Sequence, residues 1–135
     1  MACPSAKERD VVREAGGVKA LVRLVRHTDT STEAVLLLAA EALRLLMEPA
    51  EHLPSFRSQG GVGALIHLCS CAYPDAQAEA ASTLQRLATD ASNHQSIRDE
   101  GILPLVKLMG AGTDAAKVAA KLTLNSIAET HEQPS

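Results

Sequence analysis

The sequence repeats itself with a period of about 40 residues, and this period constrains the fold more than any other feature. A glycine followed by an apolar run, of which Gly-Gly-Val-x-Ala-Leu-Val-x-Leu is the fullest form, occurs three times. The aligned leucines of these runs are Leu21, Leu65 and Leu105, which lie 44 and 40 residues apart. A period of this length is typical of repeat proteins, in which each unit buries its apolar face against its neighbours.

Two further landmarks keep the same period. A leucine that follows alanine or threonine recurs 41 and 40 residues apart, at Leu43, Leu84 and Leu124. A large apolar residue stands four positions before each glycine, at Val12, Phe56 and Ile97. The three landmarks divide residues 1–135 into one domain of three repeats at approximately 6–47, 50–88 and 91–130, and residues 131–135 form a polar tail.

The pattern inside each repeat is helical. Leu21, Leu24 and Val25 follow the i, i+3, i+4 spacing of an apolar helix face. The stretches 32–47, 75–88 and 114–129 are rich in alanine and leucine, and sustained apolar–polar alternation is absent from the sequence. The sequence therefore predicts an all-α chain, in which a short helix, a second helix and a long third helix make up each repeat.

Turn and cap residues occur at the expected boundaries. The long helices have candidate N-caps at Ser31 or Thr32, at Asp75 and at Thr113. A glycine at each corner between the first and second helices predicts a positive φ there, and Pro104 suits the first turn of the helix that follows.

Composition excludes several classes of function. Lys and Arg total 13 and Asp and Glu total 16, so the net charge of −3 does not favour nucleic acid or anionic lipid. The longest apolar run, 34–40, is far shorter than the roughly 20 residues of a membrane-spanning helix. Three cysteines and a polar N-terminus without a signal-peptide core predict a cytoplasmic or nuclear protein.

The glycine-containing runs, the period and the order of helices resemble the armadillo repeat. The stretch that is most similar to the family, 93–102, reads Asn-His-Gln-Ser-Ile-Arg-Asp-Glu-Gly-Ile and corresponds to the first helix and the glycine corner. The resemblance covers approximately residues 7–130. It implies a right-handed α-solenoid of about three repeats, in which the third helices line a concave groove for an extended peptide or a partner's surface.

Family members that import nuclear proteins use a ladder of Trp and Asn in this groove. The positions that match the Asn hold Leu45, Arg86 and Ser126, and those that match the Trp hold Glu41, Ser82 and Leu122. Because neither the Asn nor the Trp residues of this ladder are present, the resemblance does not extend to that mode of recognition.

The same six positions are the candidate partner-binding face. They form three i, i+4 pairs, so each pair lies on one face of its helix. In this interpretation Leu45 is an exposed apolar contact, and Arg86 is a donor for a partner's carboxylate or phosphate. The alternative is that Glu41 and Arg86 are solvated surface charges and Leu45 belongs to the core.

Candidate chemistry is sparse. His67 and Cys71 are spaced i, i+4 and suit a zinc pair, but two further ligands at zinc-finger spacing are missing. Cys69 aligns with Val25 and Met109 and is interpreted as a small core residue. No nucleophile elbow or phosphate-binding glycine loop occurs. We therefore expect no catalytic residue, cofactor or metal.

These observations predict a protein–protein interaction adaptor that is not an enzyme. The partner is expected to be another protein or an extended peptide, and neither nucleic acid nor membrane is expected. One alternative is a structural protein that self-associates through its terminal repeats or belongs to a longer array. A more remote alternative is a small metal-binding protein.

Overall fold

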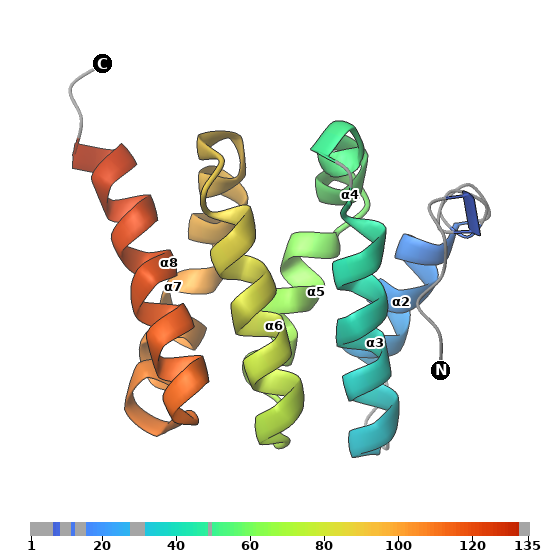
Figure 1. The fold of residues 1–135 in the computed structure, drawn as a ribbon, viewed down its shortest axis with the longest axis horizontal. Coiled ribbons are helices and arrows are strands. Elements are labelled where there is room, and N and C mark those ends of the chain that lie inside the picture. Colours follow the sequence, from blue (N-terminus) through green and yellow to red (C-terminus); the bar gives the residue numbers. More distant parts are fainter. Residues whose placement is uncertain (1–6, 9–11, 13–15, 28–31, 49, 133–135) are drawn as a thin grey trace.

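The computed structural model describes residues 7–8, 12, 16–27, 32–48 and 50–132, and all regular structure within these ranges is helical (Figure 1). The prediction of an all-α chain is confirmed. The described elements are α2 (Gly17–His27), α3 (Glu33–Leu46), η1 (Ala50–His52), α4 (Leu53–Ser58), α5 (Gly61–Leu68), α6 (Pro74–Leu87), η2 (Ala91–Asn93), α7 (His94–Ala111) and α8 (Asp114–Glu132).

The helices lie in two layers. The long helices α3, α6 and α8 stand side by side in chain order, and α2, α5 and α7 lie behind them (Figure 1). Each long helix contacts its neighbour in the row and the helix behind it. This arrangement leaves α2 and α3 at one end of the row and α7 and α8 at the other.

Local sequence explains where the long helices begin. Thr32 caps α3, because its hydroxyl oxygen accepts a hydrogen bond of 3.4 Å from the amide of Val35. Thr113 caps α8 in the same way. The predicted cap at Asp75 is wrong, since Tyr73 is the N-cap residue of α6 and Pro74 occupies the first turn, where its fixed φ suits a helix.

Most of the landmark residues lie in the core. Leu43, Leu65, Leu84 and Leu105 are completely buried. Phe56 packs so closely on Gly61 that a Cβ added to the glycine would lie 2.5 Å from the aromatic ring. Val12 and Ile97 pack in the same way on the glycine of their own units.

The predicted glycine corner occurs in the first two units and is wrong for the third. Gly16 and Gly60 have φ values of +86° and +89° and turn the chain before α2 and α5. The third copy is one residue shorter and contains a single glycine, Gly101, which packs beneath Ile97. Because no second glycine is present to adopt the left-handed conformation, α7 continues through Gly101 and contains Pro104 in its interior.

Replacement of Gly60 tests the importance of this corner. We expect Gly60→Ala to lower the free energy of unfolding by about 1–2 kcal/mol, because an L-residue is strained at φ +89°. Gly110→Ala is the control, since Gly110 lies within α7 with no neighbour near its added Cβ, and this change should raise stability by about 0.5 kcal/mol. Urea denaturation followed by circular dichroism measures both, and wild-type stability of Gly60→Ala would contradict the strain argument.

Candidate functional site

The six residues of the predicted face lie on the three long helices of one layer. Glu41 and Leu45 are on α3, Ser82 and Arg86 on α6, and Leu122 and Ser126 on α8. Of these side chains, Ser82, Arg86 and Leu122 are exposed, and the other three are partly buried. We call these six residues the third-helix face.

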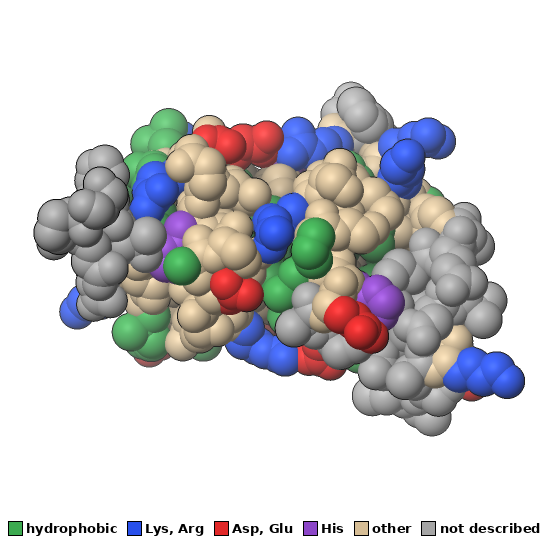
Figure 2. Space-filling model, turned by 90° about the horizontal axis from the view of Figure 1, so that it is seen from above, with side chains coloured by type: hydrophobic (Ala, Val, Ile, Leu, Met, Phe, Trp, Pro, Cys, Tyr) green, Lys and Arg blue, Asp and Glu red, His purple; other side chains and the backbone are tan. Residues whose placement is uncertain are grey.

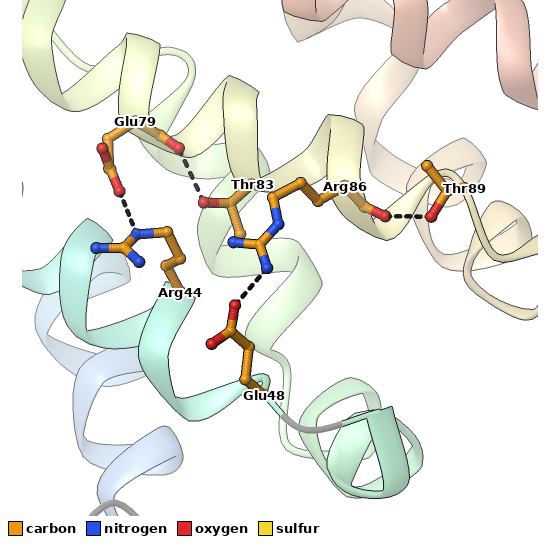
Figure 3. A network of polar contacts seen from close by, with 6 residues as sticks. All are labelled: Arg44, Glu48, Glu79, Thr83, Arg86 and Thr89. Carbon is orange, nitrogen blue, oxygen red and sulfur yellow. Dashed lines mark hydrogen bonds and ion pairs between the residues drawn. The ribbon is translucent and has the colours of Figure 1, made fainter. Parts of the chain in front are cut away.

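Two ion pairs connect α6 to the first unit beside this face, one to α3 and the other to Glu48, which follows the end of α3 (Figure 3). Arg44 Nε donates to Glu79 Oε1 at 2.6 Å, and both side chains are about one-third exposed. Arg86 Nη2 donates to Glu48 Oε1. The guanidinium that was predicted to bind a partner's carboxylate therefore already binds a carboxylate of its own chain. Because half of the Arg86 side chain is exposed, its guanidinium is still accessible to a partner from solvent.

Sequence reasoning missed Arg44, Glu48 and Glu79. The signal was the order of these charges, since Arg44 precedes Glu48 in the first unit and Glu79 precedes Arg86 on α6. Two neighbouring segments with opposite charge order can form two ion pairs at once. At the junction of α6 and α8, the positions aligned with these four residues hold Gln85, Thr89, Ala119 and Ser126, none of which is charged. Ion pairing of this kind is therefore particular to the first two units.

A cavity of about 410 Å³ opens beside Arg86, where the C-terminal ends of α3 and α6 meet the following turns. Its lining is Met47, Glu48, Leu53, Arg86, Leu87, Thr89, Asp90 and Asn93. The lining combines apolar side chains with both signs of charge, which suits a side chain of a bound peptide.

The carboxylate of Asp90 remains ionised at the edge of this cavity. It accepts hydrogen bonds from the amide and the hydroxyl of Ser92, at 3.0 and 2.8 Å. These bonds are the main cause of its lowered pKa, and the charges of Arg57 and His94 act in the same direction.

Leu45 lines a second cavity of about 370 Å³ at the N-terminal end of the row. The other lining residues are apolar or glycine: Val12, Gly17, Ala20, Leu21, Ala42 and Leu46. Leu45 is therefore half-buried against apolar neighbours, which lies between the two interpretations that the sequence left open.

The residues of the metal alternative have separate environments. His67 is exposed, and the Cys71 thiol donates to the carbonyl of Tyr73 at 3.6 Å. Cys69 is a buried core residue, and burial, with a smaller effect of Cys71, raises its pKa to about 12. Within the described ranges, no group of three or more His, Cys, Asp and Glu side chains is arranged to hold a metal ion.

Charge on the surface is mixed. Seen from above the row, acidic and basic side chains are interspersed, and neither sign forms a continuous patch on the visible part of this face (Figure 2). None of the described helices is long and apolar enough to cross a membrane.

Comparison with known proteins finds no match among protein-family models, curated proteins or solved structures. The resemblance to armadillo repeats therefore rests on the residues quoted above, and so does every functional inference. The structure adds the layer in which the third-helix face lies, its ion pairs and its two adjoining cavities.

Proposed function

We propose that this chain is an armadillo-type right-handed solenoid that binds another protein, or an extended peptide, in a concave groove across α3, α6 and α8. The observation that carries the proposal is the layer of three long helices packed side by side, with Ser82, Arg86 and Leu122 exposed on them. In this proposal the chain has no catalytic activity of its own.

The rigidity of this layer favours binding. Two ion pairs and a completely buried row of side chains, which includes Ala80, Leu84 and Ala120, hold the helices in place. A partner that docks on a preorganised surface loses less conformational entropy than one that must order it.

The middle of the third-helix face combines a charged donor with an adjoining cavity. Arg86 offers N–H donors to a carboxylate, and the adjoining cavity accepts a side chain between Glu48 and Asp90. A peptide that presents an acidic residue to Arg86 and a neighbouring side chain to this cavity would fit both.

Two variants of α6 test the proposal, with the protein used as bait in cell lysate and its partners identified by mass spectrometry. Ser82→Glu and Arg86→Gln change the face at the middle helix and leave both ends of the row intact. The control is His67→Glu. It introduces the same glutamate as Ser82→Glu, but at an exposed residue of the other layer. Circular dichroism confirms that all variants fold.

We expect a partner that the wild type and the control recover equally, and at least tenfold less recovery with each α6 variant. Equal recovery by all four proteins would place the binding surface elsewhere. Recovery of no specific protein by the wild type would contradict the interaction function itself.

A further inference from the structure

The C-terminal end of the row exposes apolar side chains that are buried in the middle unit. On α7, three aligned positions have exposed fractions between 39 and 51%: Ile102, Val106 and Met109. Their counterparts on α5 have exposed fractions of only 2–3%: Val62, Ile66 and Cys69. Val118 of α8 is also 57% exposed. We call Ile102, Val106, Met109 and Val118 the C-terminal end face.

Contacts inside the molecule show how the residues aligned with the C-terminal end face pack when another unit follows. The Cδ1 of Ile66 on α5 lies 3.2 Å from a Cβ built on Gly101 of the next unit. The Cγ1 of Val22 on α2 lies 3.4 Å from a Cβ built on Gly60. Val106 aligns with both residues. It therefore offers to a following unit the contact that Val22 and Ile66 already make.

The N-terminal end of the row exposes the complementary surface. Leu38 of α3 is 56% exposed and aligns with Glu79, which reaches back to Arg44 on the preceding long helix. It also aligns with Ala119, which is buried. Its position therefore faces the unit that precedes it. We call Leu38, the exposed Val35 beside it, and Leu21 and Leu45 in the apolar cavity of about 370 Å³ the N-terminal end face.

We propose that a second copy of this chain covers these surfaces, with the C-terminal end face of one molecule stacked on the N-terminal end face of the next. Such a contact would continue the interface that joins the three units, because Val106 aligns with Ile66, which contacts the following unit, and Leu38 aligns with Glu79, which contacts the preceding one. Terminal units of stable repeat proteins normally have polar outer faces, whereas the described residues include the exposed apolar side chains Val106 and Val118 at one end and Leu38 at the other. The proposal concerns the ends of the row and shares only Leu45 with the third-helix face.

The two surfaces that meet in this contact are different, so the contact is heterologous and each added molecule leaves both kinds of face open. Association therefore grows in steps and does not stop at a dimer. A substitution that blocks one face of a molecule therefore stops growth of the assembly on that side of the molecule.

Analytical ultracentrifugation over a range of concentrations tests the proposal with Val106→Glu and Leu38→Glu. We expect the average mass of the wild type to rise with concentration beyond that of a dimer, and each variant alone to remain monomeric. An equimolar mixture of the two variants should form one-to-one dimers and nothing larger, because each variant retains one intact face. His67→Glu, which adds the same charge away from both ends, should associate like the wild type.

Three results would overturn the proposal. The first is a wild type that stays monomeric at its highest soluble concentration. The second is a Leu38→Glu variant that still dimerises, which would indicate contact between two identical faces. The third is a mixture of the variants that forms no complex. Both substituted residues are more than half exposed, so the variants should fold. If circular dichroism shows that either does not, Val106→Gln and Leu38→Gln replace them under the same criteria.

Discussion

Phe56→Ala is expected to lower the free energy of unfolding by about 3–5 kcal/mol, which is a large part of the 5–15 kcal/mol typical of a domain. The ring is 1% exposed and packs on Gly61 at the start of α5 in the same unit. Its removal loses apolar burial and leaves a cavity that the surrounding helices cannot fill.

The matched control for this change is Val12→Ala at the aligned position of the first unit. Val12 also packs on its glycine, but it is 48% exposed, so its truncation should cost less than about 1 kcal/mol. Urea denaturation followed by far-ultraviolet circular dichroism measures both variants. Equal losses would show that the burial of the side chain does not decide how much this landmark contributes to stability.

Asn93→Ala is expected to lower the free energy of unfolding by about 2–4 kcal/mol, because it removes two hydrogen bonds of a completely buried side chain. The Asn93 Oδ1 accepts from Arg57 Nη1 at 2.5 Å, and its Nδ2 donates to the carbonyl of Leu87 at 2.8 Å. These bonds join α4 of the second unit and the end of α6 to the start of the third unit. The bond from Arg57 is charge-assisted and should be the stronger.

A double-mutant cycle with Arg57→Ala separates the charged bond from the rest. We expect a coupling energy of about 1.5–3 kcal/mol between Arg57 and Asn93 in urea denaturation. The exposed Gln95→Ala, whose amide contacts Asp99 on the same helix, is the control and should change stability by less than about 0.5 kcal/mol. A coupling energy near zero would mean that the ion–amide contact does not stabilise the junction.

Much of the fold could be predicted because periodicity reports burial. The spacing of Leu21, Leu65 and Leu105 and of the other landmarks follows from the need of each unit to bury the same face. Apolar period 3.6 identified the helices, and the hydroxyls of Thr32 and Thr113 identified two of their starts. The absence of the third glycine corner was not predicted, because the alignment matches Gly101 to Gly16 and Gly60 although the third copy has one glycine fewer.

The candidate site was less predictable. The sequence placed Arg86 on the third-helix face, but the partner that it has in the structure, Glu48, lies 38 residues away in the chain. The sequence did not decide whether Leu45 belongs to the surface or to the core. Its half-buried position in an apolar cavity depends on α2 and α3 together. Pairings across units depend on side-chain reach, which a repeat pattern does not encode.

The sequence by itself determined that the chain is helical, that it repeats three times and which residues recur at each landmark, because these properties follow from local propensity and from burial that is identical in every unit. Only the tertiary structure decided which copies of a repeated residue are covered. Ile66 and Val106 occupy the same place in the pattern, yet the first is buried and the second is half exposed. The difference arises because burial requires a neighbour, and position in the row decides which residues have one.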